Sequence, residues 1–450
     1  MGFNGRQRLI VGGVSAALVV AACSSGEATP TESAAPDPTP TATAPANPAP
    51  ATATPVQQPP GASPTLPPAI ETPTAQPTIV PTPTRTPLPT FTPNATQRLG
   101  ITSFITTGWK TNFEKHNVEY DEIFSAQVKD GIASVDRPTF ETPDAASEWL
   151  TDRDPVVAVE LNGVAKAYPL AILLWHEIVN DEIGGTPVVV TFCPLCNTAL
   201  VFERVVNGEP VEFGTTGNLR NSDLIMYDRT TESWWQQITG TAIVGDLTGT
   251  QLTFVPATIV SFGDFRDAFT EGQVLSKDTG FGGLFDNNYG INPYSRYDSD
   301  TNDPFLFFGE RDIRLPLMER VVGVAIGGQA KAYPFDDLKR ERVVHDEIGG
   351  QAIVVFWKSG TASALDNRMI ATSKDVGATG VFLTTVEGRE LTFQSTDDGF
   401  TDEETGSLWN IFGKAIAGPL AGEQLEPVIH ANHFWFAWVA FSPDTLIHGR

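Results

Sequence analysis

Two cysteines, Cys193 and Cys196, form a Cys-x-x-Cys motif directly after an apolar, β-branched run of the chain. Such a pair supports three kinds of chemistry. It can be a redox dithiol, because a neighbouring thiol and a helix N-terminus lower the thiol pKa. It can supply two soft ligands to a metal such as Zn or Cu(I). In an oxidising compartment it can instead form a structural disulfide across a tight turn.

A zinc site usually takes four ligands, and the chain has no second cysteine pair to supply the other two. His176, which precedes the cysteine-bearing run, is the candidate to join Cys193 and Cys196. A lone histidine beside an apolar face is more often a structural residue, so this hypothesis needs further support. Arg229, beside Asp228, could bind an anion or form a surface ion pair, and we favour the ion pair. Trp235 could line a pocket, but a place in the core is the default for a buried aromatic residue. The residues that we expect to support the site are Glu177, Asp181, Asn197, Arg220, Asp228, Arg229 and Trp235.

An internal repeat favours a single site. Residues 156–200 align without gaps on residues 321–365, at an offset of 165, and 20 of the 45 aligned residues are identical. In the second copy, His176, Cys193 and Cys196 are replaced by Glu341, Lys358 and Thr361, whereas the Ala-Lys-Ala-Tyr-Pro and Asp-Glu-Ile-Gly-Gly segments recur. A duplicated fold needs its turns and core in both copies but its chemistry in only one. The same joint loss is also expected of a local packing cluster.

The repeat predicts the elements that position these residues. Residues 156–161 and 164–168 are strand-like runs joined by Asn162-Gly163, a dipeptide typical of a two-residue hairpin turn. Pro169 favours the start of a short helix over residues 170–179. Residues 187–192 predict a buried strand, and residues 198–204 predict the next one. The predicted fold is a β-rich α+β, internally duplicated domain with mostly antiparallel sheets and short helices. Its first unit is residues 101–290 and its second, degenerate unit is residues 291–450.

The first hundred residues predict a membrane-anchored, extracytoplasmic protein. Two arginines precede a short apolar run, residues 9–20, which ends in Ala21-Ala22-Cys23. This order is typical of a signal peptide, residues 1–22, and small residues before a cysteine resemble the bacterial lipobox. We therefore expect lipid on Cys23 to attach the protein to the cell membrane. Residues 23–100 are nearly all Pro, Thr, Ala and Ser, which cannot bury a core, and they predict a disordered tether.

Charge and cysteine count exclude several classes of protein. The chain has 54 acidic and 29 basic residues and a formal net charge of −25, which argues against a nucleic-acid partner because such surfaces need basic patches. Only two cysteines remain beside Cys23, so a disulfide framework is excluded. The sequence has no phosphate-binding P-loop, dinucleotide-binding glycine motif or hydrolase nucleophile elbow. The sequence therefore indicates no substrate.

Several ordered motifs resemble the bacterial and archaeal DUF3179 family. The motifs are His-Glu-Ile-Val-Asn-Asp at residues 176–181, Thr-Phe-Cys-Pro-Leu-Cys-Asn at 191–197, and Met-Tyr-Asp-Arg at 226–229 with Trp235. Lys-Asp-Gly-Ile at residues 129–132 and the Ala-Lys-Ala-Tyr-Pro element also fit the family pattern. The likeness runs from about residue 107 to near the C-terminus, and it weakens after Lys358. The family is one of unknown function, so the resemblance implies no activity.

Two functional hypotheses follow from these residues. The first is an extracytoplasmic lipoprotein with a metal-binding or thiol-redox site at His176, Cys193 and Cys196, for which Zn or Cu would be the metal. The alternative is a non-enzymatic envelope protein that binds a small molecule or a protein partner. In that alternative, Cys193 and Cys196 form a structural disulfide.

Overall fold

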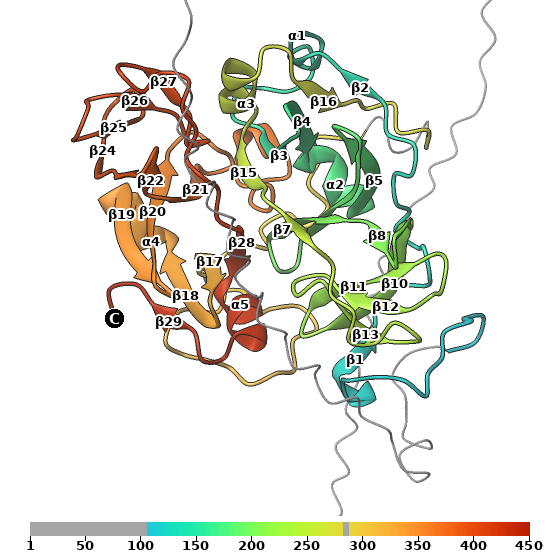
Figure 1. The fold of residues 1–450 in the computed structure, drawn as a ribbon. Coiled ribbons are helices and arrows are strands. Elements are labelled where there is room, and N and C mark those ends of the chain that lie inside the picture. The colour runs from blue at the N-terminus through green and yellow to red at the C-terminus, as the bar shows by residue number, and fades with distance from the viewer. Residues whose placement is uncertain (1–105, 282–287) are drawn as a thin grey trace, which may run out of the picture. The chain divides into compact units, whose positions relative to one another are not determined.

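The computed structural model describes residues 106–281 and 288–450. The predicted signal peptide, the lipidation site at Cys23 and the tether lie outside the described residues. The described chain is β-rich with a few short helices, and nearly all of its strand pairings are antiparallel, as predicted (Figure 1). No helix in this part of the chain combines the length and the apolarity needed to cross a membrane.

A hairpin, a short helix and a second hairpin lead to the cysteines. Asn162 and Gly163, with φ of 52° and 76°, form the turn of the first hairpin, as predicted, because this turn needs two left-handed residues. The last six residues of β6 are buried, which fits their continuous apolar run. The elements are β3 (Pro155–Leu161), β4 (Val164–Pro169), α2 (Leu170–His176), β5 (Ile178–Ile183) and β6 (Thr186–Cys193).

Helix α2 is shorter than the sequence predicts. The prediction ran to residue 179, but the helix ends at His176 because Glu177 has a left-handed φ of 58°. Ile178 then begins β5, which pairs antiparallel with β6 and places Ile178 opposite Thr191. Ile178 and Val179 are both apolar and β-branched, which favours a strand, and both are fully buried. Strand pairing with β6 therefore prevails over continuation of the helix.

The second half has the same five elements in the same order. Each begins and ends 165 residues after its counterpart, and Gly327-Gly328 forms the first turn with φ of 59° and 83°. This correspondence agrees with the repeated sequence. Origin by duplication and the unit boundary at residue 290 stay predictions. The elements are β17 (Arg320–Ile326), β18 (Gln329–Pro334), α4 (Phe335–Glu341), β19 (Val343–Ile348) and β20 (Gln351–Lys358).

The flanking elements also correspond between the halves. In the first half, β15 pairs antiparallel with β3, and β16 runs parallel to β4. In the second half, β28 pairs antiparallel with β17, and β29 runs parallel to β18. A helix joins the two strands in each case. These elements are β15 (Thr258–Ser261), α3 (Phe262–Ala268), β16 (Gln273–Leu275), β28 (His430–Phe434), α5 (Trp435–Phe441) and β29 (Leu446–Ile447).

The remaining elements extend the sheets of these two units or form further sheets beside them. In the first half, one sheet has the order β14-β7-β6-β5 and another the order β1-β10-β11-β12-β13. The first-half elements are β1 (Ile123–Ser125), β2 (Phe140–Glu141), α1 (Pro143–Ala146), β7 (Thr198–Glu203), β8 (Val205–Val206), β9 (Glu209–Pro210), β10 (Phe213–Arg220), β11 (Asp223–Asp228), β12 (Trp234–Gln236), β13 (Thr241–Val244) and β14 (Phe254–Val255). Those of the second half are β21 (Ala378–Leu383), β22 (Thr385–Val386), β23 (Arg389–Glu390), β24 (Phe393–Ser395), β25 (Phe400–Asp402), β26 (Leu408–Trp409) and β27 (Ala415–Ala417), and single 3-10 turns lie at Tyr120–Glu122 and Ile370–Thr372.

The two halves share their hydrophobic core. One buried cluster joins the first-half β strands to Phe434 and Phe436, and another joins Val156 to Phe356. The backbone N–H of Phe434 donates to the carbonyl of Cys196 at 2.8 Å. Strand β28 therefore ends against the turn that carries the second cysteine, beside β7 (Figure 1).

Candidate metal centre

Two tight turns face each other in the first half. Cys193 is the last residue of β6, and Cys196 lies in the turn that leads into β7. The second turn, Asn221-Ser222, joins β10 to β11, and its positive φ values of 51° and 65° make it a two-residue hairpin turn. Asp223 follows as the first residue of β11. The second turn thus brings a carboxylate to the cysteines from a different sheet.

The three side chains converge. The two Sγ atoms and a carboxylate oxygen of Asp223 all lie within 4.8 Å of one another. Cys193 is 2% exposed, and Cys196 and Asp223 are fully buried. The cysteines are free thiols, and they donate to the Ser222 carbonyl at 3.7 and 3.4 Å respectively. The group therefore offers two sulfur ligands and one oxygen ligand in a place closed to solvent.

The Asp223 carboxylate is held on one side. Its Oδ2 accepts hydrogen bonds from Gln236 Nε2 at 2.7 Å and from the Ile238 N–H at 3.0 Å. Its Oδ1 is buried and has no nitrogen or oxygen donor among residues 106–281 and 288–450, and the Cys193 and Cys196 thiols are the further donors that act on this carboxylate. Thiols are weak donors, so this oxygen is poorly satisfied, which favours a ligand at the site.

A second carboxyl group adds to the negative charge. Glu177 is 8% exposed, and burial, followed by the charge of Asp223, raises its pKa to about 8. Burial raises the pKa of Asp223 to about 6, against the hydrogen bonds from Ile238 and Gln236. Burial likewise raises the pKa of both thiols. No lysine or arginine is among the groups that oppose these shifts, so the centre lacks a compensating cation from the described protein.

His176 does not join this group. Its Nδ1 contacts the Ala133 carbonyl at 2.7 Å, and its Nε2 contacts the Tyr289 hydroxyl at 2.6 Å. The group of ligand atoms that lie within 4.8 Å of one another contains the two sulfurs and the Asp223 oxygen, and it includes neither ring nitrogen of His176. Burial lowers the pKa of this imidazole, so it is neutral near pH 7. The structure thus places Asp223 where the sequence predicted His176.

Asp181 belongs to the scaffold. Its carboxylate accepts from Lys166 Nζ at 2.8 Å and from the Tyr168 hydroxyl at 2.6 Å. The second half repeats this arrangement, since Tyr333 donates to Asp346 at 2.8 Å. A contact that is present in both halves does not mark the site of one half.

Asp228 and Trp235 belong to a second repeated arrangement. Trp235 Nε1 donates to Asp228 Oδ2 at 3.1 Å, and the Thr231 N–H donates to its Oδ1 at 2.6 Å. In the second half, Trp409 Nε1 donates to Asp402 Oδ2 at 2.9 Å, and Thr405 takes the role of Thr231. This network holds β12 in the first half and β26 in the second half in place. It supplies no atom to the cysteine centre.

The remaining predicted residues have structural roles. Arg220 donates to Glu122 at 2.6 Å. Arg229 forms ion pairs with Asp130 at 3.3 Å and Asp136 at 3.2 Å, which is the surface role that the sequence offered as its alternative. Asn197, with φ of 53°, supplies the left-handed residue that ends the cysteine turn. Glu177 is therefore the one supporting candidate whose charge acts on the cysteine centre.

Sequence reasoning did not identify Asp223 as a member of the cysteine centre. The signal that would have found it is the Asn221-Ser222 dipeptide between two strand-like runs, which predicts a hairpin and so an acidic residue at the first position of a strand. Nothing in the sequence places that hairpin against the cysteine turn, because the two turns belong to different sheets.

The centre is unlike a thiol-redox site. Reactive cysteines are partly exposed and have lowered pKa values, because the thiolate is the nucleophile. Here both sulfurs are buried, their pKa values are raised, and the neighbouring charges are negative. Metal coordination fits the donor set better, because a cation removes the penalty for ionising these groups together.

Most of the described fold matches a known protein family. Residues 129–445 match the family described as "Protein of unknown function (DUF3179)". This match covers both halves of the fold and the whole cysteine centre. The chain therefore belongs to the DUF3179 family. No match to a curated protein was found, and none to a solved structure.

Proposed function

We propose that this protein is an extracytoplasmic zinc-binding protein in which Cys193, Cys196 and Asp223 hold one Zn²⁺ and the charge of Glu177 adds to the attraction for the cation. The convergence of two sulfurs and a carboxylate oxygen within 4.8 Å, in a buried place, supports this proposal. Zinc binds cysteine sulfur at about 2.3 Å and carboxylate oxygen at about 2.0–2.2 Å. Tetrahedral ligands at these bond lengths lie about 3.5 Å apart, so a small inward movement of these three side chains would bring them to zinc.

Charge also supports a divalent cation. Two thiolates and two carboxylates cannot all ionise in a buried place without a compensating positive charge. Zn²⁺ would replace the protons that these groups otherwise carry, so its binding would release protons. Asp223 Oδ1 has no nitrogen or oxygen donor in the described residues, so zinc would satisfy an oxygen that otherwise has only weak thiol donors nearby.

The donor set favours zinc over copper. Cu(I) selects soft thiolate and thioether ligands, whereas Zn²⁺ accepts thiolates together with carboxylate oxygens. The centre is closed to solvent, which is typical of structural zinc sites rather than of catalytic sites with an open position. In this proposal, zinc stabilises the first half of a domain that lipid on Cys23 attaches to the membrane.

The metal content of the full chain tests the proposal. The chain is purified without chelator, and bound metals are measured by plasma mass spectrometry. We expect about one zinc per chain, and less than a tenth of that for Cys193→Ser, Cys196→Ser and Asp223→Asn. Thr361→Ser is the control, because Thr361 occupies in the second half the position of Cys196 and is equally buried. Its zinc content should be that of the unaltered chain.

Two results would overturn the zinc proposal. If the purified chain contains copper in place of zinc, the three side chains remain the ligands but the proposed metal is wrong. No bound metal, together with no titratable thiol in the unfolded and unreduced chain, would favour the structural disulfide between Cys193 and Cys196.

A further inference from the structure

A cavity of about 310 Å³ lies between the two halves, away from the cysteine centre. The first half contributes residues of β3, β15 and the loop after α3, and the second half contributes β21 and the segment that leads into β28. None of the cysteine, aspartate or glutamate residues of the proposed zinc site lines it. Ligand pockets usually begin at about 300 Å³, so this cavity has room for a small molecule.

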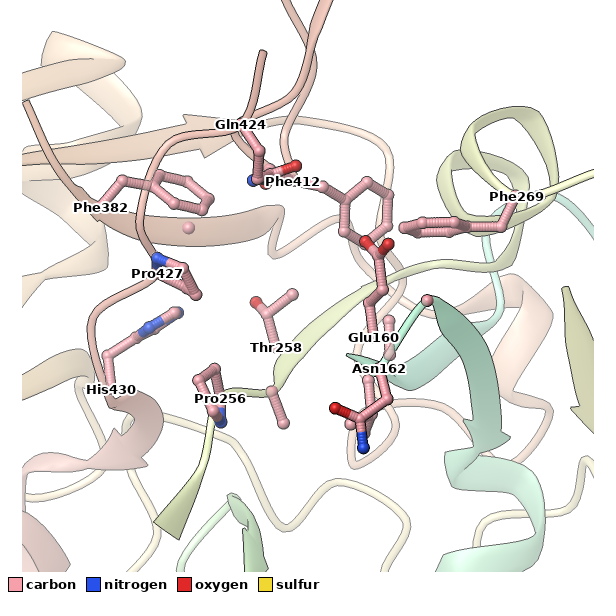
Figure 2. Close-up of a pocket in the computed structure, with 15 residues that line it drawn as sticks. Glu160, Asn162, Pro256, Thr258, Phe269, Phe382, Phe412, Gln424, Pro427 and His430 are labelled. Atoms are coloured by element: carbon pink, nitrogen blue, oxygen red, sulfur yellow. Dashed lines mark hydrogen bonds between the residues drawn. The ribbon is translucent and has the colours of Figure 1, made fainter. Parts of the chain in front are cut away.

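The walls of the cavity are aromatic. Phe382 lies on one side, and Phe269 and Phe412 lie on the other (Figure 2). The rings of Phe269 and Phe412 meet edge to face, with their centroids 4.9 Å apart. Pro256 and Pro427 add apolar surface near His430, at the end of the cavity away from Phe269 (Figure 2). Such walls favour a flat apolar body, because aromatic rings prefer edge-to-face or offset stacking contacts.

His430 supplies a hydrogen-bond acceptor at one end. Its Nδ1 contacts the Val428 carbonyl at 2.8 Å, so Nδ1 carries the proton that it donates. Burial lowers the pKa of the ring, against the carbonyls of Val428 and Thr379, so the imidazole is neutral near pH 7. Its Nε2 then presents a lone pair. That nitrogen is buried and accepts no hydrogen bond in the part of the chain that the structure describes, because the carbonyl of Thr379 that acts on the ring has no proton to donate. The ring points into the cavity (Figure 2).

The charge around the cavity excludes anions. Glu160 extends into it from β3, near the Phe269 and Phe412 rings (Figure 2). No lysine or arginine is among the described residues that line it. A negatively charged ligand would therefore meet a carboxylate and find no cation, whereas a neutral ligand pays no such penalty.

We propose that this cavity binds a small, neutral aromatic molecule that carries one N–H or O–H group. The ring of the ligand lies between the phenylalanines, and its N–H or O–H donates to His430 Nε2. This site is independent of the zinc proposal, since the two share no residue.

Binding of three related probes to the full chain tests the proposal. Indole has the ring and the N–H donor, 1-methylindole lacks the donor, and indole-3-acetate adds a negative charge. We expect indole to bind about five- to tenfold more tightly than 1-methylindole, which is the effect of one hydrogen bond. Indole-3-acetate should bind more weakly than indole. Affinities are measured by titration calorimetry or by the line widths of the ligand NMR signals.

Two variants assign the binding to this cavity. His430→Phe should abolish the preference for indole over 1-methylindole while it keeps affinity for the aromatic ring. His448→Phe is the control, because His448 lies outside the cavity and should keep the preference. Ala257→Met, which places a larger side chain in the lining, should weaken the binding of indole at least tenfold.

Three results would overturn the proposal. The first is that the unaltered chain binds indole and 1-methylindole with equal affinity. The second is that Ala257→Met leaves the binding of indole unchanged. The third is that indole does not bind at millimolar concentration. Each can be read from the unaltered chain or from Ala257→Met, so the test stands even where His430→Phe fails to fold.

Discussion

Glu177 and Arg342 occupy the same position of the two halves, directly after a seven-residue helix, and both have positive φ, 58° and 66°. Helices commonly end with glycine at a left-handed position, because a Cβ atom is strained there. Neither half uses glycine. In the first half, the strained residue carries a carboxylate that acts on the cysteine centre. Because both halves keep a non-glycine residue at this left-handed position, the strain belongs to the shared fold, and only the carboxylate is particular to the first half.

Replacement of both residues by glycine separates strain from metal binding. In the metal-free protein, Glu177→Gly and Arg342→Gly should each raise the free energy of unfolding by about 1 kcal/mol, because glycine relieves the left-handed backbone. The gain should be smaller for Arg342→Gly, since Arg342 lies over the Trp357 ring. Only Glu177→Gly should weaken zinc binding, by at least tenfold. Urea unfolding and a chelator competition measure the two effects. Unchanged zinc affinity in Glu177→Gly would show that the charge of Glu177 does not act on the bound metal.

The repeated aspartates provide a test of scaffold residues. Asp228→Asn and Asp402→Asn each replace a buried carboxylate that accepts hydrogen bonds from a tryptophan and a threonine. Both should lower the free energy of unfolding by about 2 kcal/mol, because buried partners are left unsatisfied. Neither should change zinc content. If Asp228→Asn loses zinc and Asp402→Asn does not, Asp228 acts on the metal centre and its role is not purely structural.

Zinc should stabilise the folded chain. A ligand that binds only the folded state at 100 times its dissociation constant adds about 2.7 kcal/mol. A chelator should therefore lower the melting temperature of the unaltered chain, and added zinc should restore it. Cys193→Ser should melt at one temperature with or without zinc. A chelator-insensitive melting temperature in a chain that contains zinc would mean that the metal binds elsewhere.

His433 should make stability fall in acid. This residue is buried, and burial lowers its pKa from 6.5 to about 3. Below pH 6.5 the imidazole binds a proton in the unfolded chain but stays neutral in the folded chain. The free energy of unfolding therefore decreases as the pH falls from 6.5 toward 3. Each pH unit in that window contributes about 1.4 kcal/mol. The matched variant is His433→Gln, whose amide can keep a hydrogen bond to Thr198.

The two chains are compared by urea unfolding at pH 7, 6, 5 and 4. The difference in unfolding free energy between the unaltered chain and His433→Gln should shift in favour of the variant as the pH falls. Because other groups titrate equally in both chains, they cancel in this difference. A constant difference across the four pH values would show that the ring titrates normally.

The sequence predicts local features well and long-range contacts poorly. The Asn162-Gly163 turn and the strand that ends at Cys193 follow from local residue preferences, and the structure has both. The helix end at His176 was missed because the prediction extended the helix over Ile178 and Val179, two β-branched residues that instead pair with β6. The cysteine pair was found from its spacing. Asp223 was missed because its approach to Cys196 depends on how two sheets pack, which no local pattern encodes.

The hydrogen bond from the Phe434 N–H to the Cys196 carbonyl ties the cysteine turn to the second half of the fold. Phe434 is the last residue of β28, and β28 pairs along its length with β17. The cover over the cysteine turn is therefore supplied in part by the half that lacks the cysteines. A substitution that loosens β28 should make the two thiols easier to modify, even though it alters no residue of the first half.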